Sequence, residues 1–227
     1  MCIRDSGDIV HLEAITLKRY RADGTVVWST SGGSQTDPAV GPNGDVALGG
    51  VRTNEPHGST DVTYYNSNGT IRWQKTSSKG TRTQVCFGPD GTLYTTTSGT
   101  TAFNPDGTVK WTGVNGGWGV SLDGLGRALV PQSNKVFAYD RLNGALLWSA
   151  TLPFAGSIVE GLSIDLSNRV YVTSTDGYIA CLRPDGTLAW NLKVCDQFYT
   201  QPSISTGATA VATGRVGYDT MSVYRVK

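Results

Sequence analysis

One sequence pattern recurs along this chain: an aspartate or asparagine, then a glycine and, four residues after the glycine, a tryptophan. Successive tryptophans of the pattern lie 45, 38, 37 and 42 residues apart. A repeat of this period constrains the fold more than any single residue does, because every copy must form the same supersecondary unit. The pattern uses five of the six tryptophans, namely Trp28, Trp73, Trp111, Trp148 and Trp190.

Each copy of the pattern is predicted to be a β-hairpin. Asx-Gly pairs support the positive φ angles that tight hairpin turns require. Short alternating runs flank the turns, such as Thr101–Phe103 before one turn and Thr108–Trp111 after it. Alternation of β-branched and aromatic residues with polar ones is typical of half-buried strands. The second strand of each hairpin therefore carries a large indole.

A second hairpin precedes each of the later copies. Its turns are expected at Asn43-Gly44, Asp90-Gly91, Asp123-Gly124, Ser167-Asn168 and Thr206-Gly207. Two hairpins in about 40 residues make four strands, which is the period of a β-propeller blade. The blade units are predicted at about 7–30, 35–76, 82–113, 117–151, 158–194 and 199–227. No helix is expected.

The predicted fold class is therefore all-β, a propeller of five to six four-stranded antiparallel blades. Residues 7–30 are expected to supply three strands and residues 199–227 another three, so the ring is expected to be open or imperfectly closed. A β-sandwich does not repeat one motif five times, and a solenoid suits two hairpins per unit less well. A WD40 pattern is disfavoured because no motif tryptophan is followed by aspartate, and kelch repeats have a longer period.

The first six residues, MCIRDS, resemble a translated sequencing adapter and are interpreted as an artefact at a truncated gene end. Residues 7–227 are then the propeller, and the signal peptide is presumed lost with the missing sequence. The expected location is periplasmic, cell-surface or secreted.

Charge and cysteine content exclude several classes of protein. A net charge of +1 gives no basic excess for nucleic acid, and no apolar run approaches the roughly 20 residues of a membrane span. Cys86, Cys181 and Cys195 lack metal-ligand spacing and are interpreted as buried, with a Cys181–Cys195 bridge left open. His11 and His57 stand apart, so neither a metal site nor a triad is expected.

Residues 138–148, AYDRLNGALLW, resemble the tryptophan-docking motif of PQQ-like (quinoprotein-type) propellers, with Asn143 in place of the family's threonine. The other four copies keep the glycine and the tryptophan in a turn one residue shorter. The resemblance covers nearly all of residues 7–227. It implies that the five motif tryptophans pack against the neighbouring blade and are structural.

The resemblance does not extend to catalysis. Family members that are dehydrogenases hold PQQ against a pair of adjacent cysteines, and this sequence has no Cys-Cys pair. No cofactor is therefore expected, and quinone-dependent oxidation is disfavoured. The family also includes a propeller lipoprotein of the outer-membrane assembly machinery, which acts through protein contacts.

Candidate binding residues lie where the repeat units differ. Positions entering the first strand of each blade, at the mouth of the central channel, carry different side chains: Asp37, Gln84, Trp118, Glu160 and Gln201. Trp118 lies among glycines in Asn115–Gly119, where its indole can stack on a sugar or aromatic ligand or pack across the channel. The polar loop Val51–Thr60 is either a contact surface or an ordinary solvated loop.

The sequence thus favours a non-catalytic propeller that presents one face to a protein or glycan outside the cytoplasm. The alternative is a lyase or hydrolase acting on polysaccharide, with Glu160 and Asp37 as acids at the channel mouth. That alternative requires the two carboxylates to converge on one pocket. A third possibility is an adhesive or structural repeat belonging to a longer surface protein. The oligomeric state is not predicted.

Overall fold

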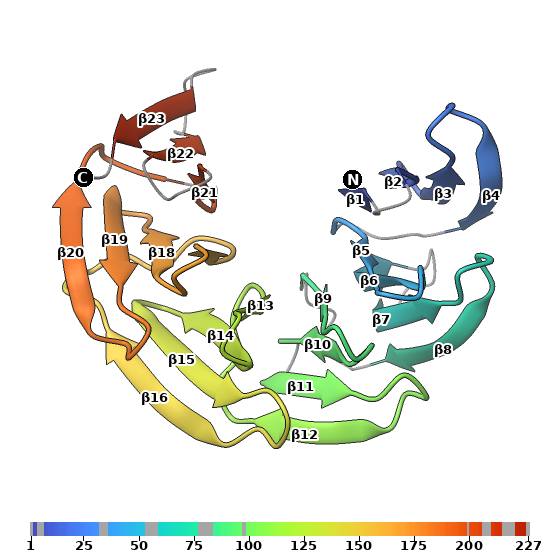
Figure 1. Ribbon diagram of the computed structural model, residues 1–227, viewed down its shortest axis with the longest axis horizontal. Coiled ribbons are helices and arrows are strands. Elements are labelled where there is room, and N and C mark those ends of the chain that lie inside the picture. The colour runs from blue at the N-terminus through green and yellow to red at the C-terminus, as the bar shows by residue number, and fades with distance from the viewer. Residues whose placement is uncertain are drawn as a thin grey trace. The chain divides into compact units, whose positions relative to one another are not determined.

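The computed structural model describes residues 2–3, 7–31, 36–52, 59–76, 84–96, 99–198, 200–205, 210–214 and 221–225. The chain divides into two compact units, Met1–Thr112 (unit 1) and Gly113–Lys227 (unit 2), and each is considered by itself. The described residues form antiparallel sheets and contain no helix (Figure 1). The all-β prediction is therefore confirmed.

Unit 1 contains three four-stranded sheets whose strands are paired in chain order. The first comprises β1 (Cys2–Ile3), β2 (Ile9–Glu13), β3 (Thr16–Tyr20) and β4 (Val26–Ser31). The second comprises β5 (Ala39–Val40), β6 (Val46–Arg52), β7 (Ser59–Tyr65) and β8 (Ile71–Thr76). The third comprises β9 (Cys86–Phe87), β10 (Leu93–Thr95), β11 (Thr100–Phe103) and β12 (Val109–Gly113), which ends at the unit boundary.

Unit 2 repeats this arrangement. Its first sheet comprises β13 (Ser121–Leu122), β14 (Arg127–Gln132), β15 (Lys135–Asp140) and β16 (Leu146–Thr151). Its second comprises β17 (Ser163–Ile164), β18 (Val170–Thr173), β19 (Tyr178–Leu182) and β20 (Leu188–Lys193). The last sheet has three described strands, β21 (Ser203–Ile204), β22 (Ala210–Gly214) and β23 (Met221–Arg225).

Three details of the sequence prediction were wrong. Residues 7–30 supply three strands as predicted, but the first sheet has a fourth, because β1, which lies within the six residues interpreted as an artefact, pairs with β2. The loop predicted at Val51–Thr60 is shorter, because β6 runs to Arg52 and β7 starts at Ser59. The turn placed at Asp123-Gly124 has its left-handed residue at Gly126, with φ 79°.

The core lies between consecutive sheets, so second strands such as β10, β14 and β18 are buried on both faces, and β11, which was predicted to be half-buried, is mostly buried as well. In β6, Val46 and Leu48 pack with Val10 and Leu17 of the first sheet, whereas Ala47 packs with the third sheet. The outermost strands, such as β4 and β20, keep the half-exposed pattern, and so does β2 in the first sheet.

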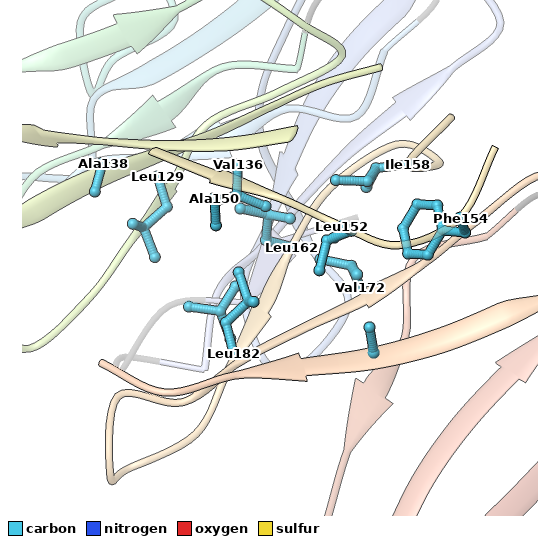
Figure 2. Close-up of a cluster of buried hydrophobic side chains, with 12 residues drawn as sticks. Leu129, Val136, Ala138, Ala150, Leu152, Phe154, Ile158, Leu162, Val172 and Leu182 are labelled. Atoms are coloured by element: carbon cyan, nitrogen blue, oxygen red, sulfur yellow. The ribbon is translucent and has the colours of Figure 1, made fainter. Parts of the chain in front are cut away.

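The same layering holds in unit 2. Figure 2 shows a cluster in which Leu129, Val136 and Ala138 of the first sheet meet Val172 and Leu182 of the second. Alternate residues of β18 point to opposite sides, so Tyr171 contributes to a separate cluster with Phe198. Burial of these apolar surfaces, at about 25 cal/mol per Å² of area removed from water, supplies the main force that holds neighbouring sheets together.

Four of the five motif turns are closed in the same way, whereas at the fifth Asn143 Oδ1 accepts only from the Ala145 backbone N–H. In the turn of the first sheet, Asp23 Oδ1 accepts hydrogen bonds from the Thr25 backbone N–H, at 2.9 Å, and from its hydroxyl, at 2.7 Å. The glycine takes a positive φ, 85° at Gly24, as the hairpin requires. The aspartate or asparagine, the glycine and the threonine thus form one local unit that returns the chain into the outer strand.

Candidate functional site

Two motif tryptophans of unit 1, Trp28 and Trp73, lie against the motif glycine of the following sheet. A Cβ added to Gly69 would lie 2.8 Å from Cδ2 of Trp28, and one added to Gly107 would lie 3.0 Å from Cγ of Trp73. Trp28 Nε1 also donates a hydrogen bond to the Ser67 carbonyl at 2.9 Å. The glycine therefore serves the turn through its φ angle and the neighbouring sheet through its lack of a side chain.

Unit 2 contains the same junction between its first two sheets. A Cβ on Gly186 would lie 2.8 Å from the Trp148 ring. Here Arg127 Nη1, not the indole, donates to the carbonyl of Pro184, two residues before the glycine. The guanidinium lies 5.6 Å from the Trp148 ring centroid. The buried Trp148 Nε1 has no hydrogen-bond partner among the described residues.

The other two motif tryptophans each contact a tyrosine of their own sheet. Trp111 is 7% exposed and its ring centroid lies 5.8 Å from that of Tyr94. Trp190 lies 6.2 Å from Tyr171.

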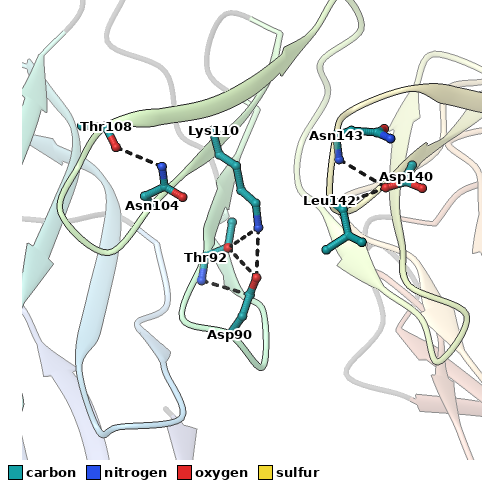
Figure 3. A network of polar contacts seen from close by, with 8 residues as sticks. All are labelled: Asp90, Thr92, Asn104, Thr108, Lys110, Asp140, Leu142 and Asn143. Carbon is teal, nitrogen blue, oxygen red and sulfur yellow. Dashed lines mark hydrogen bonds and ion pairs between the residues drawn. The ribbon is translucent and has the colours of Figure 1, made fainter.

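The inner hairpin turn of most described sheets carries an ion pair. In unit 1, Asp45 meets Arg72 at 3.1 Å and Asp90 meets Lys110 at 3.0 Å (Figure 3). Burial raises the pKa of Asp90, but hydrogen bonds from Lys110 and Thr92 outweigh it and bring that pKa down to about 2. This carboxylate is therefore ionised at neutral pH and is fully engaged in holding the turn.

In unit 2 the pair lies within one turn. Asp123 Oδ2 accepts from Arg127 Nε at 2.6 Å, and Asp165 Oδ2 accepts from Arg169 Nε at 2.7 Å. Burial opposes ionisation of Asp165, but bonds from the Arg169 backbone and side chain lower its pKa. At the outer turn of the same unit, the Asp140 carboxylate accepts from the Leu142 and Asn143 backbone N–H groups (Figure 3).

Strand register divides the five candidate binding residues into two sets. Ala39, Cys86, Ser121, Ser163 and Ser203 occupy the same place in the first strand of five sheets. Asp37, Gln84 and Gln201 stand two residues before that place, where the other two sheets have Gly119 and Gly161. Trp118 and Glu160 stand one residue earlier still, so they are equivalent to each other.

Trp118 lies on a connection that is packed tightly against the first sheet of unit 2. A Cβ on Gly117 would lie 1.6 Å from the Pro131 carbonyl oxygen. Asn115 donates from Nδ2 to the Tyr139 hydroxyl at 2.8 Å. Gly117 beside Trp118 therefore allows close backbone packing and is not part of a flexible tether. The indole itself is 57% exposed.

Glu160 lies on the next connection of unit 2. Its side chain is exposed, and its backbone has a φ of 54°, in the left-handed region that side chains other than glycine rarely adopt. The flanking backbone is fixed, because Ile158 donates to the Ser133 carbonyl at 2.7 Å and Val159 to the Thr173 carbonyl at 3.0 Å. Strain of this kind is often found where a side chain has a task beyond packing.

The remaining candidates are less distinctive. Asp37 is exposed and Gln84 half-buried in unit 1, while Gln201 is exposed in unit 2. Asp37 and Glu160, the paired acids of the alternative enzyme hypothesis, belong to different units. Within the polar loop predicted at Val51–Thr60, residues 53–58, which include Glu55 and His57, lie outside the described residues.

Sequence reasoning missed the serine that connects neighbouring first strands in unit 2. The Ser121 hydroxyl donates to the Leu162 carbonyl at 2.8 Å, and the Ser163 hydroxyl donates to the Pro202 carbonyl. The signal was present as serine at one register position in three successive sheets, but it appears only once the register is known.

Cys181 and Cys195 are free thiols, so the bridge that the sequence left open between them is not formed, and burial raises the pKa of Cys181. Within the described part of the chain, no group of three or more His, Cys, Asp or Glu residues is placed to hold a metal. No helix of membrane-spanning length and apolarity occurs in the same residues.

A family model described as outer membrane protein assembly factor BamB matches residues 15–165 and 132–226. The fold is also similar to the crystal structure of BamB from Moraxella catarrhalis, with a TM-score of 0.65 and 12% sequence identity. That match covers 91% of this chain and 66% of the other, so the chain spans just under two thirds of that structure. No curated protein matches the chain.

At this identity, the structural match shows the fold, which is a β-propeller. The family model covers well over half of the sequence, in two overlapping segments that include all five motif tryptophans. The chain therefore belongs to the PQQ-like β-propeller repeat family that this model represents.

Proposed function

We propose that the chain is a non-catalytic scaffold that binds a protein partner outside the cytoplasm. The observation that carries the proposal is the contrast between Trp118 and the five repeated tryptophans. Repeated residues are used to join sheets, whereas Trp118 is the one tryptophan outside the motif and is exposed on a rigid connection. Exposed aromatic side chains on fixed backbone are frequent anchors of protein interfaces.

The family supports a role in the cell envelope. The matching model is named for an outer membrane protein assembly factor, and such a factor must contact other proteins. An extracytoplasmic location and a protein partner for this chain both rest on that membership. The residues predicted to line the channel mouth, Trp118, Glu160, Asp37, Gln84 and Gln201, are the proposed contact residues.

Glycan binding at the same indole is the second candidate. An exposed indole offers a flat apolar face to a sugar ring, and the Asn115 side chain lies on the same connection. A polysaccharide lyase or hydrolase would need Glu160 to meet a second acid or a base in one pocket. The exposed, strained position of Glu160 is the feature that favours it.

Site-specific photocrosslinking separates these functions. A benzoylphenylalanine is placed at position 118 in protein exported to the periplasm of a Gram-negative host, and adducts are identified by mass spectrometry. A second protein carries the same group at Leu166, which is 92% exposed on an inner hairpin turn. We expect a protein adduct from position 118 alone. Absence of that adduct, together with binding of the wild-type protein on a glycan array, would overturn the protein-binding proposal.

A further inference from the structure

Five connecting segments of unit 2 form one continuous surface. They are residues 113–120, 132–134, 152–162, 174–177 and 194–198, here called the loop surface. Backbone bonds join the later segments in series: Ile158 to Ser133 at 2.7 Å, Thr175 to Ser157 at 2.9 Å and Val194 to Gly177 at 2.9 Å. The first segment is joined by the approach of Gly117 to Pro131 and by the bond from Asn115 to Tyr139.

The loop surface is fixed from below. Phe154, Ile158, Leu162 and Phe198 of its segments are at most 5% exposed and take part in the two core clusters of the unit. A Cβ on Gly177 would lie 1.8 Å from the Cys195 carbonyl oxygen, so these segments too are in close backbone contact. A surface whose backbone is already ordered loses little conformational freedom on binding.

Apolar side chains stand out from one end of this surface. Val114 is 91% exposed and Trp118 is 57% exposed. Both lie on the segment whose backbone Asn115 and Gly117 hold in place, and neither side chain is buried in the core. Exposed indole and valine on one short segment give a partner an apolar area to cover.

The charges of the loop surface have one sign. Its five segments contain Glu160, Asp176 and Asp196 but no lysine or arginine. Burial disfavours the charged form of Asp176, but bonds from the Ser174 hydroxyl and the Gly156 N–H outweigh it and lower the pKa of Asp176. Lys135 and Lys193 flank the segments on β15 and β20, and Lys193 Nζ lies 5.7 Å from the Tyr178 ring centroid.

We infer that the loop surface of unit 2 receives a segment of a protein partner in which lysine or arginine flanks an apolar side chain. The apolar side chain covers Trp118 and Val114. The lysine or arginine of the partner lies between the Trp118 indole and the Glu160 carboxylate. The indole face attracts it by a cation–π interaction. Charge complementarity of this kind gives a partner specificity and a faster approach. The inference deepens the proposed scaffold function and rests on it.

The test uses two synthetic peptides, one of alternating lysine and valine and a matched one of alternating glutamate and valine. Each is labelled with fluorescein, and binding to the full chain is followed by anisotropy at about 0.01 M and about 1 M salt, where the Debye length is roughly 30 Å and 3 Å. We expect binding of the lysine peptide alone, and weaker binding at high salt.

Three variants locate the binding. Trp118→Ala should weaken binding of the lysine peptide about 10-fold, as expected for an aromatic anchor. Glu160→Gln should weaken it by about 2- to 5-fold, the scale of one exposed charge pair. Leu166→Ala, at a residue of an inner hairpin turn, should leave it unchanged. Circular dichroism and urea unfolding confirm that each variant is folded.

Equal binding of the two peptides, or unchanged affinity in both Trp118→Ala and Glu160→Gln, overturns the inference. Its failure is distinguishable from failure of the scaffold proposal. If position 118 crosslinks to a protein but the lysine peptide does not bind, the scaffold function stands and the inference is wrong. If the lysine peptide binds, position 118 gives no protein adduct and the wild-type protein binds on a glycan array, the loop surface binds cations but the scaffold proposal fails.

Discussion

The two units neutralise the charges of their inner hairpin turns with different residues. In unit 1 the cation comes from the outermost strand of the sheet, as Arg72 of β8 does for Asp45 and Lys110 of β12 does for Asp90. In unit 2 both charges stand in one turn, since Asp123 begins it and Arg127 ends it. The difference teaches that the turn requires a compensated charge, while the strand that supplies each partner is interchangeable.

The contact that both units share is the one between sheets. In each unit a tryptophan of one outer strand lies on a glycine of the next outer turn, as Trp28 on Gly69 and Trp148 on Gly186. Below that contact, the nearest carbonyl accepts from the previous sheet in both units, at Ser67 and at Pro184. The tryptophan–glycine contact that recurs in both units is therefore structural, whereas the residues that supply the charges of the turns differ between the units.

The largest expected difference between units concerns the turn arginines. Arg127→Ala should lower the free energy of unfolding by about 3–5 kcal/mol, because it leaves the fully buried Asp123 carboxylate without its cation. Arg72→Ala should cost only about 1 kcal/mol, because Arg72 is 35% exposed and Asp45 keeps bonds from Tyr64 and Ser67. Urea denaturation of both variants measures this. Equal losses would show that the two turns are equivalent after all.

The shared tryptophan–glycine contact should be sensitive to a single methyl group in both units. Gly69→Ala and Gly186→Ala should each cost about 2–5 kcal/mol, from left-handed strain of about 1–2 kcal/mol and overpacking of about 1–3 kcal/mol. Gly24→Ala is the matched control, since Gly24 has the same φ of 85° but nothing within 4 Å of the added Cβ. It should show only the strain. The comparison, again by urea denaturation, fails if the control loses as much stability as the other two variants.

The two units also differ in the hydrogen bonds that serines make between neighbouring first strands. Unit 2 has these serines, whereas unit 1 has Ala39 and Cys86 at the same register position. Ser121→Ala should cost about 1 kcal/mol, the net value of one hydrogen bond. Ser203→Ala should change stability by less than about 0.5 kcal/mol, because Ser203 is exposed. Thermal unfolding of the two variants distinguishes them. A loss of stability of the same size at both positions would show that the Ser121 hydrogen bond does not stabilise the fold.

The smallest effect is a pH dependence in unit 1. The pKa of Asp90 is about 2 in the folded chain against an ordinary 3.8, so its contribution is complete above that ordinary value and is lost as pH falls toward 2. Lys110→Met should reduce this acid-dependent contribution by less than about 1 kcal/mol, because Asp90 is partly exposed. Unfolding free energies of wild type and variant, measured from about pH 5 to pH 2, should converge at the acid end. A constant difference across that range would exclude the ion pair as the cause.

Much of the fold was predictable because each residue of the repeated motif has a local structural role. The glycine indicates the turn, and the tryptophan indicates the outer strand. The second role of Gly69, as the surface on which Trp28 lies, was not readable, because it depends on two residues 41 positions apart in sequence. Strand β1 was missed because two residues held by backbone bonds have no side-chain pattern.

The candidate site was predictable only in part. The sequence identified Trp118 and Glu160 as unrepeated residues entering a first strand, and the structure finds both exposed. It did not reveal that the two are equivalent in register while Asp37, Gln84 and Gln201 belong one residue later. That distinction depends on strand pairing. The sequence also could not show why glycines lie beside Trp118. Glycine is required for close packing against Pro131 and is equally typical of a flexible loop.

The central claim is that repeated tryptophans hold the sheets together while Trp118 serves binding. The most direct measurement is the free energy of unfolding in urea for Trp118→Ala beside Trp148→Ala. Trp118→Ala should stay within about 0.5 kcal/mol of wild type, as an exposed position does. Trp148→Ala should lose about 3 kcal/mol, the lower end for a large core aromatic, because its ring is partly exposed. A loss at Trp118 as large as that at Trp148 would contradict the claim and make Trp118 a packing residue.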